Sequence, residues 1–204
     1  MAVYKMTPTK ANLIKAKSLL GFSKKGYELL DRKRMVLIKE MMNLIGKADE
    51  IQEKIDVKFK EAYQALGQAN ITMGSENVEK LALSIDKEKD FNIQFKSVMG
   101  IETPHIRYED APLATEYGFF RTNPAFDKAV LIFTEIRKII YELGEIENSV
   151  YKLAMEIKKT QKRANALEKI QIPRYTKTIK YIEEVLEEKE REDFFRLKKV
   201  KDKK

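Results

Sequence analysis

The side chains that could carry out chemistry in this sequence are few and far apart. The chain has no cysteine and a single histidine, His105, which follows Pro104. Without cysteine there is no thiol nucleophile, no disulfide and no thiolate ligand for zinc, and one histidine cannot form an ordinary zinc site. We therefore interpret His105 as a surface or turn residue rather than a metal ligand.

The neighbouring carboxylates do not have the spacing of a catalytic pair. Glu183 is followed by Glu184, and Glu187 by Glu188, and adjacent residues on a helix point in different directions. A solvated charged face explains these pairs better than acid–base catalysis. The sequence also lacks GxxxxGK[ST] and GxGxxG, the glycine-rich patterns that hold nucleotide phosphates. We predict no catalytic, cofactor-binding or metal-binding residue, and therefore a chain that is not an enzyme.

The strongest chemical signal is positive charge, with a net charge of +8. Basic residues gather in two stretches, which contain Lys24, Lys25, Arg32, Lys33 and Arg34 in the first and Lys158, Lys159, Lys162 and Arg163 in the second. Such clusters suit phosphate or a ring of carboxylates. A nucleic-acid site would also be expected to contain an element that reads bases, and the sequence shows none. Solubility of a long exposed surface is the alternative explanation.

Long helices must position these charges. The composition, 43% apolar and 35% charged with 8 Gly and 5 Pro, is typical of helices rather than of a sandwich or barrel. Thr7-Pro8 and Asn123-Pro124 each combine an N-cap residue with a proline at the first helical position. No proline lies between Pro8 and Pro104, so the first helix is predicted to reach about residue 70, a length of about 90 Å.

Both predicted helices carry a heptad of apolar residues. In the first helix the a-like and d-like positions include Leu13, Ala16, Leu20, Leu30, Leu37, Ile51, Ile55, Ala62, Ala65 and Ala69, and in the second they include Ala129, Ile132, Ile136, Leu143, Leu153, Ala164 and Leu167. Ser23, Arg34 and Lys58 interrupt the first series. A heptad sustained over this length predicts a coiled coil.

The two apolar seams are most simply each other's partners. The residues between them must then return the chain, so the pairing is antiparallel and places Met41 near Leu153 and Leu30 near Ala164. Beyond Leu167 the apolar phase slips by one residue, next to Pro173, and we predict a bend there rather than an end. The predicted fold is all-α and elongated, with segments 1–70, 71–122 and 123–204. A three- or four-helix bundle formed with other chains is the alternative.

The segment 71–122 differs in kind from the helices. Residues 78–85 suit a short helix, and Phe91, Ile93 and Phe95 alternate with polar residues as in a half-buried strand. Gly100 offers a turn to a second strand over 101–108. Since an isolated hairpin is marginal in water, it should lie against the coiled coil or a partner. The candidate partner-docking side chains in this segment are Phe91, Ile93, Phe95, Tyr117, Phe119 and Phe120.

Targeting signals are absent from the sequence. The N-terminal residues have no apolar signal-peptide core. No apolar run approaches the roughly 18 residues that a membrane span requires. We expect a cytoplasmic protein without direct membrane insertion.

Several sequence blocks resemble the D subunit of the V/A-type rotary ATPases. The resemblance is most specific toward the C-terminus, in RANALE at 163–168, IPR at 172–174 and EREDFFRLKK at 190–199. PTK at 8–10, GYELL at 26–30, SVMG at 97–100 and EYG at 116–118 are similar too. The likeness covers nearly the whole chain.

The resemblance implies a non-catalytic central-stalk shaft. Its implied partners are the ring of A and B subunits, the F subunit, and the C subunit (named d in eukaryotes). It also implies a location peripheral to the membrane in the V1/A1 sector. Candidate contacts to the catalytic ring are the basic residues Lys24, Lys25, Arg32, Arg34, Lys162, Arg163 and Arg174. A generic coiled-coil scaffold and a basic nucleic-acid-binding rod are the alternative functions.

Overall fold

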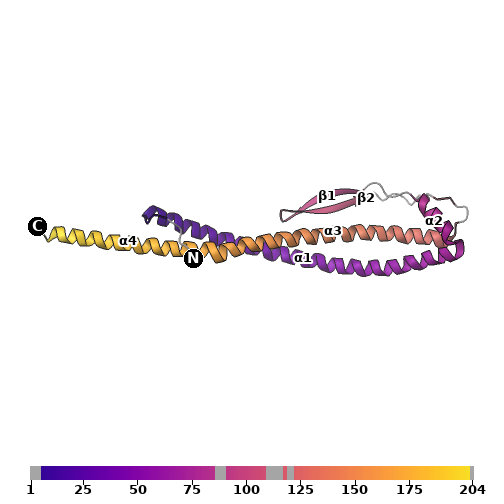
Figure 1. The fold of residues 1–204 in the computed structure, drawn as a ribbon, viewed down its shortest axis with the longest axis horizontal. Coiled ribbons are helices and arrows are strands. Elements are labelled where there is room, and N and C mark those ends of the chain that lie inside the picture. Colours follow the sequence, from indigo (N-terminus) through magenta and orange to yellow (C-terminus); the bar gives the residue numbers. More distant parts are fainter. Residues whose placement is uncertain (1–5, 86–90, 109–116, 119–121, 203–204) are drawn as a thin grey trace. The chain divides into compact units, whose positions relative to one another are not determined.

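The fold is a pair of long antiparallel helices with a short helix and a β-hairpin inserted between them. The computed structural model describes residues 6–85, 91–108, 117–118 and 122–202. The elements follow the order α1, α2, β1, β2, α3, a π-helical turn η1, and α4 (Figure 1). The chain divides into two compact units, residues 37–156 and residues 1–36 with 157–204, which we describe in turn.

Helix α1 is a single helix of 64 residues, Lys10–Met73. Its N-terminus differs from the Thr7-Pro8 start that the sequence predicted. Thr9 is the N-cap, since its hydroxyl accepts a hydrogen bond from the backbone N–H of Asn12 at 3.3 Å. The Asn12 side chain in turn donates to the carbonyl oxygen of Thr7 at 2.8 Å. The helix begins two residues later than expected because Thr9 offers a cap that satisfies an N-terminal amide.

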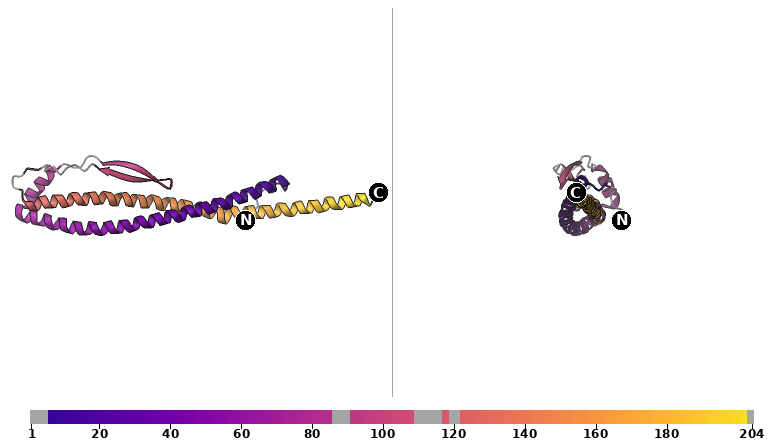
Figure 2. Two further views of the ribbon diagram at one scale, coloured as in Figure 1. Left: turned by 180° about the vertical axis from the view of Figure 1, so that it is seen from behind. Right: turned by 90° about the vertical axis from the view of Figure 1, so that its left-hand side faces the viewer.

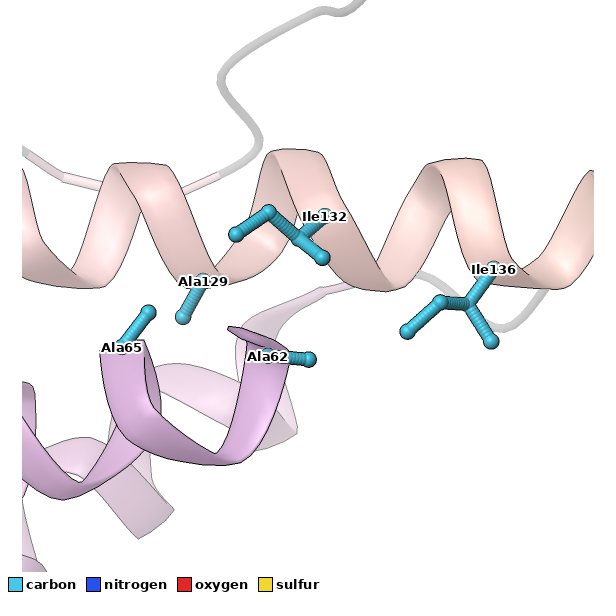
Figure 3. Close-up of a cluster of buried hydrophobic side chains, with 5 residues drawn as sticks. All are labelled: Ala62, Ala65, Ala129, Ile132 and Ile136. Carbon is cyan, nitrogen blue, oxygen red and sulfur yellow. The ribbon is translucent and has the colours of Figure 1, made fainter. Parts of the chain in front are cut away.

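In the unit 37–156, α1 packs against α3, Pro124–Ala166. Ala62 and Ala65 of α1 form a buried cluster with Ala129, Ile132 and Ile136 of α3 (Figure 3). Small residues opposite β-branched ones let the two backbones approach closely and interlock as in a coiled coil. The register matches the antiparallel pairing that the sequence predicted.

The α1 residues that are buried in the seam with α3 lie at heptad positions predicted from the sequence. All buried α1 residues in this unit, which are Leu37, Ile51, Ile55, Ala62, Ala65 and Ala69, occupy predicted a-like or d-like positions. Helix α3 begins at Pro124 as expected, and the Asn123 side chain accepts a hydrogen bond from the Ala125 N–H at 3.3 Å. The binary pattern therefore predicted both the partner face and the register.

Helix α1 turns into the insert at Gly74, whose φ of 78° lies in the left-handed region that favours glycine. Helix α2, Ser75–Ser84, follows at once. Its buried Val78 joins Ala69, Tyr117 and Phe126 in a second apolar cluster. The short helix is thus held against the ends of the two long helices by side-chain burial.

The insert also contains the predicted hairpin. Strand β1, Phe91–Val98, pairs antiparallel with β2, Ile101–Tyr108, in a two-stranded sheet. Met99 and Gly100 at the turn have φ of 54° and 80°, which is the pattern of a type I′ turn. The hairpin lies alongside α3 in the views of Figures 1 and 2. It therefore leans on the coiled coil, as expected for a hairpin that is marginal by itself.

In the other unit, the start of α1 pairs with the end of α3 and with α4, Ile172–Lys201. A Cβ on Gly26 would lie 3.6 Å from the Leu167 side chain. Exposed ion pairs join Lys10 to Glu190 at 2.9 Å and Lys17 to Glu183 at 2.7 Å. These cross-helix pairs confirm an antiparallel arrangement and show how the acidic stretch of α4 is partly neutralised by lysines of α1.

The slip of the heptad has a structural cause. A π-helical turn, Leu167–Gln171, separates α3 from α4. The backbone N–H of Ile172 donates to the carbonyl oxygen of Leu167, five residues earlier, so the turn holds one residue more than an α-helical turn. The next residue is Pro173, which has no N–H to donate. The extra residue absorbs the one-residue slip, and Ile179 and Ile182 return to the buried face.

Candidate interaction surfaces

The described residues contain no cluster of three or more acidic or histidine side chains that could hold a metal ion. None of the helices in the described part of the chain is long and apolar enough to cross a membrane. What the structure does offer is a set of charged and apolar surfaces on the helices and the hairpin. The candidate sites are therefore interaction surfaces.

The basic surface consists of Lys24, Lys25, Arg32, Arg34, Lys162, Arg163 and Arg174, which we call the basic collar. All seven lie in the unit that joins the start of α1 to the end of the chain. Lys24, Lys25, Arg32, Lys162 and Arg163 are exposed, and Arg34 and Arg174 are half-buried. A contact between the side chains of Arg34 and Gln161 brings the two basic stretches level with each other.

Arg34 differs from the other collar residues because its guanidinium is already engaged. It hydrogen-bonds the amide oxygen of Gln161 across the seam and forms an ion pair with Asp31 at 2.6 Å. Gln161 then donates to Asn165 at 2.9 Å. A charge held in such a network fixes the alignment of the two helices. Arg34 therefore has a structural role in addition to its candidate role in partner binding.

Acidic side chains border the collar. The Glu168 carboxylate is the largest of several influences that raise the pKa of Tyr27 above its ordinary value. Partial burial and Asp31 act in the same direction, and Arg34 opposes them. The Tyr27–Glu168 interaction adds a polar contact between α1 and the π-helical turn, beside the place where Gly26 meets Leu167.

The candidate docking residues of the insert have different surroundings. Ile93 is 48% exposed and Phe95 is 61% exposed on β1. The side chain of Phe91, together with Phe119 and Phe120, lies outside the described residues. Two of the predicted docking residues are thus surface-accessible on a defined strand.

Tyr117 was predicted to be a partner-docking residue, but its side chain is buried within this chain. It is only 8% exposed and meets the Phe126 ring edge-on, with ring centres 5.0 Å apart. Its hydroxyl donates a hydrogen bond to Asp127 at 2.8 Å. Burial, followed by the hydrogen bond and the charge of Asp127, raises the pKa of Tyr117 to about 12. A tyrosine can bury its ring when its hydroxyl finds an acceptor, and the sequence alone did not show that Asp127 supplies one.

His105 also differs from its interpretation as a surface or turn residue. It lies within β2, half-buried, with its ring Nδ1 2.6 Å from a carboxylate oxygen of Glu145 on α3. The second oxygen of Glu145 accepts the backbone N–H of Ile106 at 3.2 Å. Lys152, two turns further along α3, donates to the carbonyl oxygen of Glu102 at 2.8 Å and lies 4.8 Å from the centre of the Phe95 ring. Two residues of α3 therefore hold the hairpin by polar contacts.

Sequence reasoning missed an apolar stripe on the outer face of α1. Phe22, Leu29 and Val36 are spaced seven residues apart and are 76%, 66% and 43% exposed. A second heptad outside the seam is the signal that would have found them. At the other end of the chain, Phe194 and Phe195 are also exposed on α4. Such apolar residues suit contact with a partner protein.

Comparison with known proteins shows the family to which this sequence belongs. The family model for the ATP synthase D subunit matches residues 12–202. The V-type ATP synthase D subunit of Thermotoga neapolitana is 45% identical over 97% of this chain and 98% of its own length. The A-type ATP synthase D subunit of Methanopyrus kandleri is 41% identical over 97% and 86%, and that of Thermococcus sibiricus 36% identical over 98% and 94%. The chain therefore belongs to the family of ATP synthase D subunits.

Proposed function

We propose that this chain is the central-stalk rotor shaft of a V/A-type rotary ATP synthase or ATPase. It would couple ATP hydrolysis or synthesis in the ring of A and B subunits to rotation of the membrane ring that translocates ions. The observation that carries the proposal is the match to the ATP synthase D subunit over nearly the whole chain, on helices paired along a heptad seam. The chain itself would catalyse nothing, and its sequence has no phosphate-binding motif.

The packing of the seam suits a shaft. Torque is transmitted only if two helices resist sliding and rolling against each other, and interdigitated side chains provide that resistance. The alanine-rich cluster of Ala62, Ala65 and Ala129 brings the backbones close. Polar links such as Lys58 to Glu135 at 2.9 Å cross the same seam and favour one register.

The asymmetric surface suits contact with a ring whose sites differ in conformation. A rotor changes the equilibrium of each site only by binding its conformations with different affinities. The basic collar would attract carboxylates of the ring, and the stripe of Phe22, Leu29 and Val36 on the same unit would add apolar contact. Together they would offer the ring both charged and apolar contacts from the same unit.

The remaining partners follow from the proposed place in the assembly. The A and B subunits would surround the unit that contains both termini, while the F subunit and the C subunit (d) would bind elsewhere on the shaft. The insert, with Ile93 and Phe95 exposed, is our candidate for docking one of these. The chain would be cytoplasmic and peripheral to the membrane, within the V1/A1 sector.

The test is a pull-down of the tagged chain from its own cell lysate, with the captured proteins identified by mass. We expect recovery of the A, B and F subunits. Capture of coiled-coil proteins without a nucleotide-binding ring would support a generic scaffold. Capture of nucleic acid that is released steeply by salt would support a basic nucleic-acid-binding rod, and either result would overturn the proposal.

A further inference from the structure

The two edges of the β-hairpin are treated differently by the structure. In a hairpin with a two-residue turn, the closing pair Val98–Ile101 is hydrogen-bonded, and bonded pairs then recur at every second residue. The backbone groups of Glu102, Pro104 and Ile106 therefore point out of the ladder on β2. Phe95 and Ile93 on β1 pair with Pro104 and Ile106, so their backbone groups also point out of the ladder, at the opposite edge of the hairpin.

The outward edge of β2 is already satisfied. Glu145 accepts the N–H of Ile106 at 3.2 Å, and Lys152 donates to the carbonyl oxygen of Glu102 at 2.8 Å. Between them lies Pro104, which has no N–H to satisfy. Helix α3 and proline together block this edge against further pairing, in the manner that sheet proteins use to protect their edges.

In the described part of the chain, the outward edge of β1 has neither the proline nor the contacts from α3 that β2 has. Among the described residues no other strand joins the sheet, and β1 contains no proline. Ile93 and Phe95 present exposed apolar side chains on one face, and Lys96 is exposed on the other face. An edge with free backbone groups and alternating side chains is a template for one more strand.

We infer that the outward edge of β1 binds an extended strand of a partner protein, which adds to the hairpin as a third strand. The strand would be apolar where it meets Ile93 and Phe95, and acidic opposite Lys96, since opposite charges across strands stabilise the pair. A second copy of this chain is a poor occupant because each copy carries a net charge of +8. The inference rests on the proposed function only in expecting the partner within the rotary assembly.

The test is residue-resolved amide hydrogen exchange on the chain alone and on the purified complex that contains it. We expect the N–H groups of Ile93 and Phe95 to exchange rapidly in the isolated chain and about 100-fold or more slowly in the complex. The N–H of Ile101 belongs to the closing hydrogen-bonded pair of the hairpin. It is the internal control and should be protected in both.

A matched pair of variants separates backbone pairing from side-chain contact. Ile93→Pro removes an outward N–H without removing a hydrogen bond of the hairpin, in the same kind of position that Pro104 already occupies. Ile93→Thr keeps the N–H and the extended backbone. We expect the proline variant to weaken capture of the partner by at least about 10-fold and the threonine variant by only about 2- to 3-fold. Protection of the Ile101 amide reports whether each variant keeps its hairpin.

Three results would overturn the inference. The first is equal exchange of the Ile93 and Phe95 amides with and without the complex. The second is protection that rises with the concentration of the chain alone, which would identify a second copy as the occupant. The third is equal loss of binding in both variants, which would assign the contact to the side chain. Failure to recover the A and B subunits in the pull-down would instead contradict the proposed function. The exchange experiment does not depend on that result, because it compares the isolated chain with any complex that the chain forms.

Discussion

Arg34 shows how a single residue can serve both the seam and the surface. Its position interrupts the heptad, but its guanidinium reaches Gln161 on the opposite helix and Asp31 on its own. A polar residue at such a position costs stability relative to an apolar one and in return disfavours shifted registers. At the residue scale, the seam is therefore specified by a few polar contacts as well as by apolar burial.

The cross-seam contact can be measured by a double-mutant cycle. We expect Arg34→Ala and Gln161→Ala each to lower the free energy of unfolding, by about 1 to 2 kcal/mol, because each leaves a partly buried partner unsatisfied. The double variant should lose less than the sum, with a coupling of about 0.5 to 1.5 kcal/mol. Chemical denaturation of the four proteins measures it. Strict additivity would show that the contact does not stabilise the seam.

Tyr117 predicts a specific dependence of stability on alkaline pH. Its pKa is raised from 10.0 to about 12, so between these values the folded state keeps a proton that the unfolded state has lost. The contribution is complete below pH 10 and disappears as the pH rises through 12. We expect the free energy of unfolding of the wild type to fall over this range more steeply than that of Tyr117→Phe.

The comparison with Tyr117→Phe cancels the other groups that titrate at high pH. At neutral pH this variant should be less stable by about 1 kcal/mol, because the Asp127 carboxylate loses a hydrogen-bond donor. Thermal unfolding of both proteins at a series of pH values provides the measurement. Parallel curves would mean that the Tyr117 proton is not held in the folded state.

At the scale of the elements, the hairpin turn carries a local strain that can be relieved. Met99 has a φ of 54°, and a residue with a Cβ is disfavoured there unless it is Asn or Asp. We expect Met99→Asn to stabilise the hairpin by about 0.5 to 1 kcal/mol. The readout is slower exchange of the hairpin amides. Gly100→Ala should make the same amides exchange faster, because a residue with a Cβ is strained at a φ of 80°. The strain comes from the backbone alone, since a Cβ at this position would meet no atom within 4 Å.

The π-helical turn is the element that reconciles two incompatible repeats. The heptad of α3 and the phase of α4 differ by one residue, and the turn Leu167–Gln171 takes up that residue without ending the helix. Pro173 follows directly, where a missing N–H is tolerated at the start of a new α-helical segment. The helix thus changes its repeat between RANALE at 163–168 and IPR at 172–174, two of the sequence blocks in which the family resemblance is most specific.

At the scale of the whole molecule, the basic collar predicts how the chain couples to its ring. Replacing Lys162, Arg163 and Arg174 with alanine should leave the helix content unchanged and reduce rotation-coupled ATPase activity of the reconstituted complex by about 10-fold. That corresponds to about 1.4 kcal/mol of lost differential contact. Since Arg174 is half-buried, the exposed pair Lys162 and Arg163 alone should show the same direction of change. Higher salt should reduce the wild-type coupling toward that of the variant.

The matched control removes the same charge elsewhere. Lys39, Lys47 and Lys54 are exposed on α1 in the other unit, and their replacement with alanine should leave coupling within about 2-fold of the wild type. Circular dichroism of both variants checks the helix content. Equal losses in the two variants, or no loss in either, would remove the case for the collar as a ring contact.

The sequence by itself determined the helices, the seam and the family. Apolar residues at a 3.5-residue repeat leave one face to bury, so every buried α1 residue, from Ala16 to Ala69, was predictable from spacing alone. The hairpin was predictable too, because alternation and Gly100 are local signals. The cap at Thr9 was missed by two residues because both Thr7 and Thr9 offer a capping hydroxyl, and only backbone geometry selects one.

Only the tertiary structure decided which side chains meet across elements. Nothing local in the sequence links His105 to Glu145, Tyr117 to Asp127 or Arg34 to Gln161, since each pair is formed by docking of distant or differently oriented segments. The same docking closed one edge of the hairpin, while among the described residues no strand pairs with the other edge. Periodicity reports which face a residue occupies, whereas the identity of its partner depends on the register and packing of the assembled helices.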